Sequence, residues 1–177
     1  MSRQGLVIVY TGDGKGKTTA ALGMALRAVG YNFKSIMFQF VKGGWRSGEL
    51  AAMERLKPEF EIRPCGKGFI GIAGDKLLVE EHQKAAIQAL DEVRRVISKG
   101  SYDIVILDEI FIALGLGLIT EEQVLELLDA RPEPLHLVLT GRGCPASIIE
   151  RADVVTEMNE IKHPYQQGRI AEIGVDF

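Results

Sequence analysis

A glycine-rich segment near the N-terminus carries the residue types that bind a polyphosphate. Residues 11–18 read Thr-Gly-Asp-Gly-Lys-Gly-Lys-Thr and lie between the apolar run 6–10 and the helix-like run 19–26. Glycines let the backbone approach phosphate oxygens, and successive N–H groups of such a turn point at the anion. In this pattern Lys17 neutralises phosphate charge, and the Thr18 hydroxyl is placed to ligate Mg²⁺. The segment predicts a nucleoside-triphosphate-binding loop.

This loop differs from the common pattern at its first position. The common form has Gly five positions before Gly16, where this chain has Thr11. Because Gly12 and Gly14 supply flexibility at other points, we interpret the loop as a variant of the common form. A tight glycine turn with a surface lysine is the alternative, and the flanking strand and helix favour phosphate binding. The predicted cradle comprises Thr11, Gly12, Asp13, Gly14, Lys15, Gly16, Lys17, Thr18 and Thr19.

Two acids follow a fully apolar run later in the chain. Asp108 and Glu109 come directly after Ile-Val-Ile-Leu at 104–107. In triphosphate-binding folds an acid at such a strand end ligates Mg²⁺ or holds a water bound to it. We expect Glu109 to be the direct ligand and Asp108 to support it. A solvated acidic pair at the end of a strand is the alternative.

An arginine between two glycines follows the next apolar run, 135–139. Arg142, flanked by Gly141 and Gly143, could reach a phosphate with two hydrogen bonds or pair with a surface acid, and both interpretations stay open. Cys144 has no identifiable partner base, so we interpret it as a structural residue.

Two further loops carry aromatic side chains. Trp45, the only tryptophan, lies in the glycine-rich segment 42–49, where it could form one wall of a ligand site or fill the edge of the core. Residues 65–74 contain four glycines. In that segment Phe69 and Ile70 either pack onto the domain or cover a large apolar ligand.

Apolar, β-rich runs alternate with helical patterns along the chain, which is typical of βαβ units. We predict an α/β, three-layer P-loop NTPase-like (RecA-like) fold with a mostly parallel sheet flanked by helices. Since ligands of such sheets bind beyond the carboxyl ends of the strands, the segments above should meet at one edge. We expect His82, in a charged helical run, to be on the surface. The predicted strands are Leu6–Tyr10, Ser35–Val41, Phe60–Pro64, Ile104–Leu107, Leu135–Leu139 and Val154–Glu157, and the predicted helices are Lys17–Val29, Glu49–Leu56, Asp75–Ser98, Thr120–Ala130 and Pro145–Arg151.

The composition indicates a single globular domain over residues 1–177. Hydrophobic residues make up 46% of the chain and charged residues 25%. The net charge of −3 and the absence of a basic block argue against a general nucleic-acid partner. No apolar run reaches membrane-spanning length. Cys65 and Cys144 are far apart in sequence and predict free thiols in a reducing compartment, so we expect a cytoplasmic protein without membrane partners.

Taken together, these segments resemble the P-loop-type ATP:corrinoid adenosyltransferases over essentially the whole chain. The Thr at the head of the loop is itself a mark of that family. Several separated motifs in the right order make a chance similarity improbable. The matching segments are 11–19, Arg-Ala-Val-Gly at 27–30, Gln-Phe-Val-Lys-Gly-Gly-Trp at 39–45, Gly48-Glu49, Gly68-Phe69, 107–109, 130–132, 140–144 and Lys-His-Pro at 162–164.

The resemblance implies an enzyme of the cob(I)yrinic acid a,c-diamide adenosyltransferase type. In that family ATP lies in the loop with its triphosphate reversed relative to other P-loop enzymes. The Co(I) of a reduced corrinoid attacks the ribose 5′ carbon, and inorganic triphosphate leaves. The resemblance also implies Mg²⁺ or Mn²⁺, a homodimer and a flavoprotein reductant.

The same resemblance places Phe69 against the lower face of the corrinoid, where apolar side chains keep Co(II) four-coordinate. Some relatives have tryptophan two residues after that phenylalanine, where this chain has Gly71. Phe69 alone, or Ile70 or Ile72, then fills the lower face.

Two other functions fit the phosphate-binding loop. One is a P-loop phosphotransferase or ATPase with another acceptor, and the other is a nucleotide-binding regulatory protein with little turnover. Released triphosphate would indicate the adenosyltransferase, phosphate or ADP the second function, and neither product the third.

Overall fold

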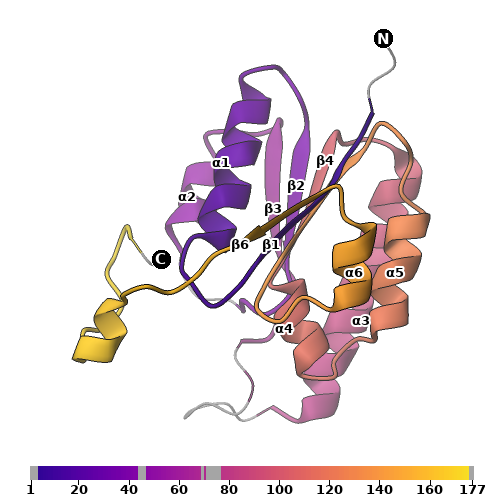
Figure 1. Ribbon diagram of the computed structural model, residues 1–177. Helices are drawn as coiled ribbons and strands as arrows, with labels where there is room; N and C mark the ends of the chain where they lie inside the picture. The colour runs from indigo at the N-terminus through magenta and orange to yellow at the C-terminus, as the bar shows by residue number, and fades with distance from the viewer. Residues whose placement is uncertain (1–3, 44–46, 69, 71–76, 176–177) are drawn as a thin grey trace.

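Six parallel strands form one sheet at the centre of the computed structural model, which describes residues 4–43, 47–68, 70 and 77–175 (Figure 1). Their order across the sheet is β3-β2-β4-β5-β1-β6, and every pairing between neighbours is parallel. The predicted parallel α/β sheet is therefore confirmed. The strands are β1 (Val7–Thr11), β2 (Ser35–Gln39), β3 (Phe60–Pro64), β4 (Ile104–Asp108), β5 (His136–Thr140) and β6 (Val154–Glu157).

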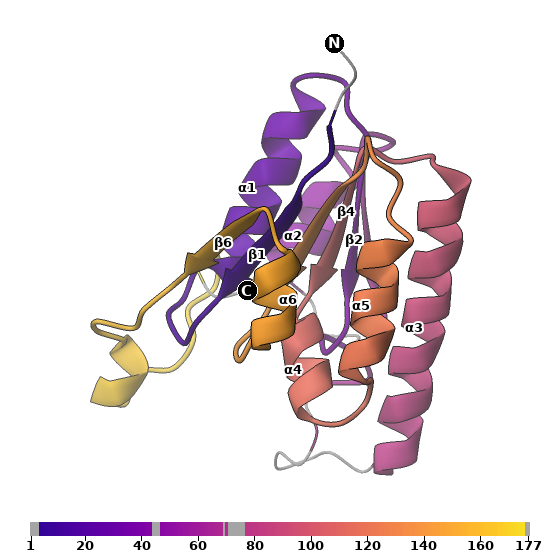
Figure 2. The same ribbon diagram turned by 45° about the vertical axis from the view of Figure 1, so that its right-hand side comes forward.

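Helices cover both faces of this sheet and produce three layers. The helices are α1 (Lys17–Val29), α2 (Gly48–Met53), α3 (Val79–Lys99), α4 (Ile110–Gly115), α5 (Glu121–Asp129) and α6 (Ala146–Arg151), followed by a short 3-10 helix η1 (Pro164–Gln167). Figures 1 and 2 show α1 and α2 on one face and α3, α4, α5 and α6 on the other. The three-layer arrangement is compatible with a P-loop NTPase-like domain.

The run 104–107 of β4 is apolar at every position because it contributes to two cores, one on each face of the sheet. In β4, Val105 and Leu107 join the core under α3, α5 and α6. Ile104 and Ile106 point the opposite way and join the core under α1 and α2. Successive strand residues face opposite sides of a sheet, so a strand covered on both faces has no position for a polar residue until it ends.

Most predicted elements are present, with shifted ends. Helix α1 and strands β3 and β6 have the predicted bounds. Strands β1, β4 and β5 each end one residue later than predicted, so Thr11, Asp108 and Thr140 are strand residues rather than loop residues. Strand β2 ends at Gln39, two residues before the predicted end at Val41.

Helix α4 was not predicted, and α3 begins at Val79 rather than Asp75, which lies outside the described residues. His82, expected on the surface, has only 3% of its area exposed. Its position on α3 explains the difference, since Ala86, Ala89 and Val93 follow at helical spacing and are all buried. Among the described helices, none combines the length and apolar character that crossing a membrane requires.

The turn after β5 contacts α4 closely. Gly141 has φ +142°, and its N–H donates to the carbonyl of Tyr10 over 3.2 Å. A Cβ at this position would lie 2.8 Å from the Cβ of Phe111. Gly143, in the same turn, also has positive φ (+73°) but no neighbour within 4 Å of such a Cβ.

We expect Gly141→Ala to destabilise the fold more than Gly143→Ala. Both substitutions place a side chain at positive φ, which costs about 1–2 kcal/mol. Only Gly141→Ala also forces atoms into α4, an overpacking that costs about 1–3 kcal/mol more. Chemical denaturation of the two variants measures the difference, and equal losses would contradict the close contact.

Candidate functional site

The predicted phosphate-binding loop, residues 11–18, packs against the chain that follows β6. The Gly14 N–H donates to the carbonyl of Met158 over 2.6 Å. A Cβ on Gly12 would lie 2.4 Å from that carbonyl oxygen, and one on Gly14 would lie 2.8 Å from it. Gly12 and Gly16 also have positive φ, +90° and +118°. The glycines of this variant loop are therefore required by conformation or by close backbone contact.

Lys17 begins α1 and its side chain turns back into the loop. Its ammonium donates to the carbonyls of Gly12 over 2.6 Å and of Gly14 over 2.7 Å. Burial lowers the pKa of Lys17, and the positive charge of Arg142 lowers it further. An ammonium has three donors, so Lys17 can shape the loop and still donate one hydrogen bond to an anion.

Asp108 connects three elements at the carboxyl edge of the sheet. Its Oδ1 accepts from the hydroxyls of Thr18 and Thr140, each over 2.8 Å. Asp108 is fully buried. Burial raises the pKa of its carboxyl, while the hydrogen bonds from Thr140 and Thr18 act to lower it. Thr18, the predicted metal ligand, is thus held by the acid that we expected to have a supporting role.

Glu109 lies next to Asp108 but faces the cavity described below. It has φ +59°, a conformation that costs a non-glycine residue energy. Its N–H donates to Thr140 Oγ1 over 3.0 Å, and its carbonyl accepts from the first turn of α4. Its Oε2 is buried, with no hydrogen-bond partner among the described residues. Burial and the neighbouring charge of Asp108 raise the pKa of Glu109 to about 7.

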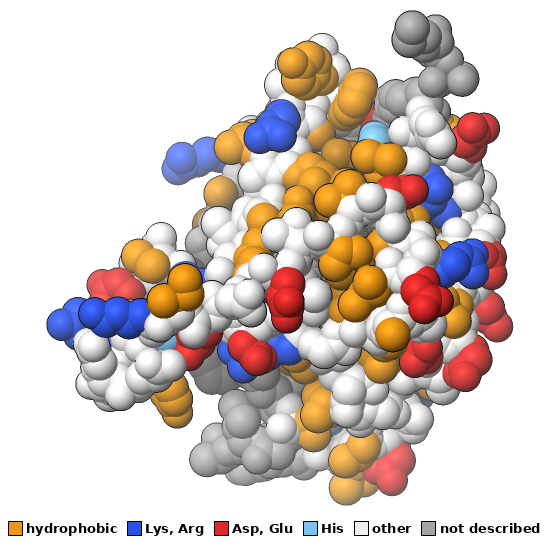
Figure 3. Space-filling view, viewed as in Figure 1, with side chains coloured by type: hydrophobic (Ala, Val, Ile, Leu, Met, Phe, Trp, Pro, Cys, Tyr) orange, Lys and Arg blue, Asp and Glu red, His pale blue; other side chains and the backbone are white. Residues whose placement is uncertain are grey.

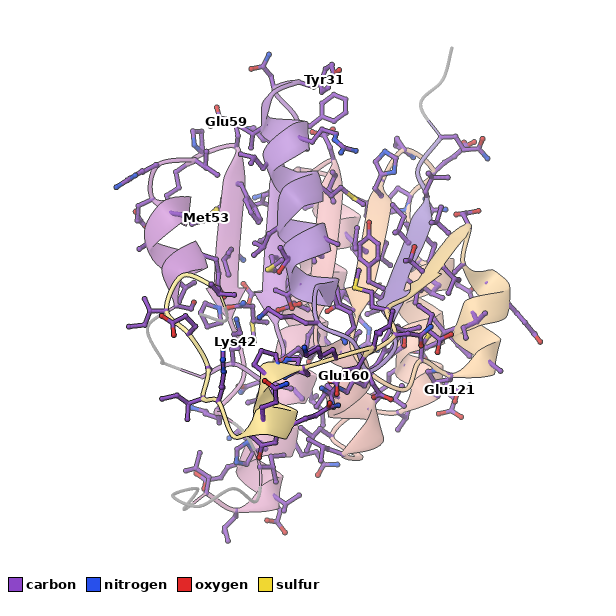
Figure 4. All side chains as sticks on the ribbon, turned by 60° about the vertical axis from the view of Figure 1, so that its left-hand side comes forward. Tyr31, Lys42, Met53, Glu59, Glu121 and Glu160 are labelled. Atoms are coloured by element: carbon purple, nitrogen blue, oxygen red, sulfur yellow. The ribbon has the colours of Figure 1, made fainter. Side chains whose placement is uncertain are left out.

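Lys17, Thr18 and Glu109 line a cavity of about 520 Å³ at the carboxyl ends of the strands. The loop and α1 form one wall, from Lys15 to Thr19. Lys42 and Glu49 form a second wall, and Arg142 also lines the cavity. Gly174 and Val175, near the C-terminus, border it as well. In Figure 4, Lys42 is labelled near the end of the sheet where α1 begins, whereas Tyr31 and Glu59 lie at the opposite end.

The position of Arg142 is compatible with both roles considered from the sequence, binding of a phosphate and pairing with a surface acid. It lines the cavity, and its Nε lies 3.9 Å from Asp13 Oδ1, an acid of the loop. Both side chains of this pair are largely exposed. The arginine is therefore within reach of a ligand in the loop as well as of a surface acid.

The remaining predicted residues lie beside the cavity or outside the described part of the chain. Cys144 donates its N–H to Thr11 Oγ1 over 3.3 Å, and burial raises the pKa of its thiol to about 12, which supports a structural role. Trp45 and Phe69 lie outside the described residues. Ile70 packs against the core under α3, α5 and α6, which favours an anchoring role for this residue.

Sequence reasoning placed the segment 42–49 at this edge but did not single out the ion pair within it. Lys42 and Glu49 form a 2.6 Å ion pair, and Gln39 Nε2 lies 3.3 Å from Glu49 Oε1. Lys42 follows a strand that the sequence predicts to end at this edge, so its position could have been recognised. The interpretation of the segment rested on its glycines and on Trp45 instead.

Comparison with known proteins identifies the family. The family model described as "ATP:corrinoid adenosyltransferase BtuR/CobO/CobP" matches residues 3–177. A corrinoid adenosyltransferase of Escherichia coli is 37% identical over 174 residues, which cover 98% of this chain and 86% of the relative. The corrinoid adenosyltransferase CobA of Salmonella typhimurium is 35% identical over the same shares, and that of Pseudomonas aeruginosa is 36% identical over 98% and 84%. This chain, with its variant phosphate-binding loop, belongs to the ATP:corrinoid adenosyltransferase family.

Proposed function

We propose that the chain transfers the 5′-deoxyadenosyl group of ATP to the cobalt of a reduced corrinoid at the cavity between the loop 11–19 and the Lys42–Glu49 wall. Membership of the family supports the reaction. The observation that carries the location is that Lys17, Thr18 and Glu109, from two separate strand ends, line one cavity. Nucleotide binding at that edge is what a parallel α/β sheet favours.

The reaction requires positioning and charge stabilisation rather than proton transfer. The Co(I) nucleophile forms a bond to the 5′ carbon, and the bond from that carbon to the triphosphate oxygen breaks. The electron pair of the broken bond leaves with inorganic triphosphate. Lys17 would hold the phosphate chain and stabilise the charge that develops on the leaving group. Arg142 would contribute from the turn after β5.

The oxygen ligands present fit a magnesium ion bound together with phosphates. Among the described residues no group of three or more His, Cys, Asp and Glu side chains could hold a metal by itself. Mg²⁺ characteristically takes one or two protein ligands and completes its shell with phosphates and water. The buried Oε2 of Glu109 and the hydroxyl of Thr18 would supply these ligands, with Asp108 fixing Thr18. Bound Mg²⁺, or Mn²⁺, would neutralise phosphate charge.

We further propose a homodimer in the cytoplasm that receives electrons from a flavoprotein. Hydrophobic side chains gather in the middle of the face drawn in Figure 3. Val154 and Val155 of the edge strand β6 are exposed, and so is Ile149 of α6, the helix that precedes this strand. An exposed edge strand with apolar side chains favours pairing with another surface. Both cysteines are free thiols, which fits a reducing compartment. The flavoprotein rests on the family resemblance alone.

Product analysis separates the adenosyltransferase from the other two functions. With ATP, Mg²⁺ and chemically reduced cobalamin, we expect equal amounts of adenosylated corrinoid and inorganic triphosphate. Chromatography of the nucleotide products and the corrinoid spectrum measure both. Omitting the corrinoid is the control and should abolish triphosphate release. Phosphate or ADP as the product would instead indicate a phosphotransferase or ATPase, and no product would indicate a regulatory protein.

Replacing Lys17 by Ala should abolish most activity and leave the fold intact. A hydrogen bond to a charged group contributes about 1.5–3 kcal/mol, or about 10-fold to 100-fold in affinity. The loss is larger if the contact strengthens in the transition state. Turnover and thermal melting of the variant are the measurements. Near-normal turnover would show that this loop does not hold the reacting nucleotide.

The two acids should respond differently to neutral substitution. Glu109→Gln removes the carboxylate that faces the cavity, whereas Asp108→Asn changes the residue that holds Thr18. Changes in groups that orient a metal ligand cost about 10-fold to 100-fold in metal affinity. We expect a larger rise in half-saturating Mg²⁺ for Glu109→Gln than for Asp108→Asn, measured by titrating turnover. The reverse order would exchange their roles.

A further inference from the structure

The second wall of the cavity, formed by Lys42 and Glu49, contains a partly buried ion pair that the proposed reaction does not yet use. Lys42 Nζ donates to Glu49 Oε1 over 2.6 Å. The side chains are 27% and 12% exposed, and both residues line the 520 Å³ cavity. Removing two charges from water offsets much of the attraction between them, so an ion pair at this depth is weak evidence for a role in stability and its position calls for another explanation.

The backbone that carries Lys42 is held firmly by the chain that follows β3. The N–H groups of Gly66 and Gly68 donate to the carbonyls of Gln39 and Val41, each over 3.1 Å. A Cβ on Gly66 would lie 2.4 Å from the Val41 carbonyl oxygen, so the two segments pack backbone to backbone. Val41 is itself buried. Lys42 therefore projects from a fixed point at the cavity wall.

Gln39 connects this wall to the acid beneath the phosphate-binding loop. Its Nε2 lies 3.3 Å from Glu49 Oε1 and 3.5 Å from Asp108 Oδ2. Asp108 in turn accepts the hydroxyl of Thr18. A continuous set of polar contacts thus runs from Lys42 under the cavity to the start of α1, and it fixes the two walls relative to each other.

The charge of Lys42 acts inside the cavity and not only on Glu49. Burial acts to raise the pKa of Glu49, but hydrogen bonds that include those from Lys42 and Gln39 hold it below its ordinary value. The same ammonium also counteracts the raised pKa values of Asp108 and Glu109. Since an ammonium has three donors and Glu49 accepts one, Lys42 can donate to an anion in the cavity without leaving the pair.

We propose that Lys42 is a second polyphosphate-binding residue, which contacts the phosphate chain of the nucleotide from a different wall of the cavity than Lys17, with Glu49 keeping its ammonium at the cavity. The inference rests on the proposed nucleotide site. A triphosphate carries several negative charges, and a leaving triphosphate gains more, so cations on two walls stabilise it better than a cation on one wall alone.

Calorimetric titration of the full chain with inorganic triphosphate, in a fixed excess of Mg²⁺ and without corrinoid, tests the inference apart from turnover. We expect Lys42→Ala to weaken triphosphate binding about 10-fold to 100-fold. Lys42→Arg keeps the charge and should lose less. Glu49→Gln leaves the lysine charge in the cavity but weakens the contact that holds it there, so it should lose less affinity than Lys42→Ala. Unchanged affinity in Lys42→Ala, or an equal loss in Glu49→Gln, would overturn the proposal.

Lys57→Ala is the matched control. Lys57 forms a 2.7 Å pair with Glu54 that is 52% and 68% exposed, and neither residue lines the cavity. This variant should bind triphosphate as the unaltered chain does. If thermal melting shows that Lys42→Ala does not fold, Lys42→Met, which retains the aliphatic stem, gives the same comparison.

Lys17→Ala in the same titration separates this inference from the proposed function. If Lys17→Ala loses binding and Lys42→Ala binds normally, the role proposed for Lys42 is wrong and the proposed nucleotide site still holds. Normal binding in Lys17→Ala would show that triphosphate binds elsewhere, and the location of the nucleotide site would then be wrong as well.

Discussion

The carboxylate of Asp108 is the constraint on which the rest of the site depends. One oxygen accepts hydroxyls from α1 and from β5, and the other faces Gln39 of β2. A fully buried acid is costly unless hydrogen bonds compensate for its lost hydration. Because the donors belong to separate elements, satisfying this one group fixes the ends of β2, β4 and β5 and the start of α1 relative to each other.

The site collects charges of both signs in a small volume. Glu109 has a raised pKa and Lys17 a lowered one, in both cases mainly because of burial. These shifts show that each group is held where its charge is poorly solvated. A bound phosphate chain would supply a negative charge beside Lys17, and a divalent cation bound with it would supply a positive charge beside Glu109. Preorganised groups of this kind lose little energy in reorganisation when charge moves during a reaction.

Much of the fold could be predicted from sequence because periodicity and composition determine it directly. The run 104–107 is apolar throughout because both its faces are buried, and the loop 11–18 has a spacing that few other structures need. The sequence also predicts that the loop, the two acids and Arg142 meet at the carboxyl edge of the sheet, and the structure places them there; their roles stay predictions. Helix α4 could not be predicted, because the residue that precedes it, Glu109, adopts a left-handed conformation that its residue type disfavours. The ion pair of Lys42 depends on two segments packing backbone to backbone, which no local pattern encodes.

The contact between Gly14 and Met158 has a consequence for how a phosphate chain can be held. In a phosphate-binding turn the backbone N–H groups are the main anion donors. Here the Gly14 N–H is already engaged by a carbonyl from the far side of the loop. One backbone donor of the loop is thereby withdrawn from any anion, whereas the first N–H groups of α1 have no partner within the helix. Anchoring the loop to the chain after β6 thus fixes its shape at the expense of one anion donor.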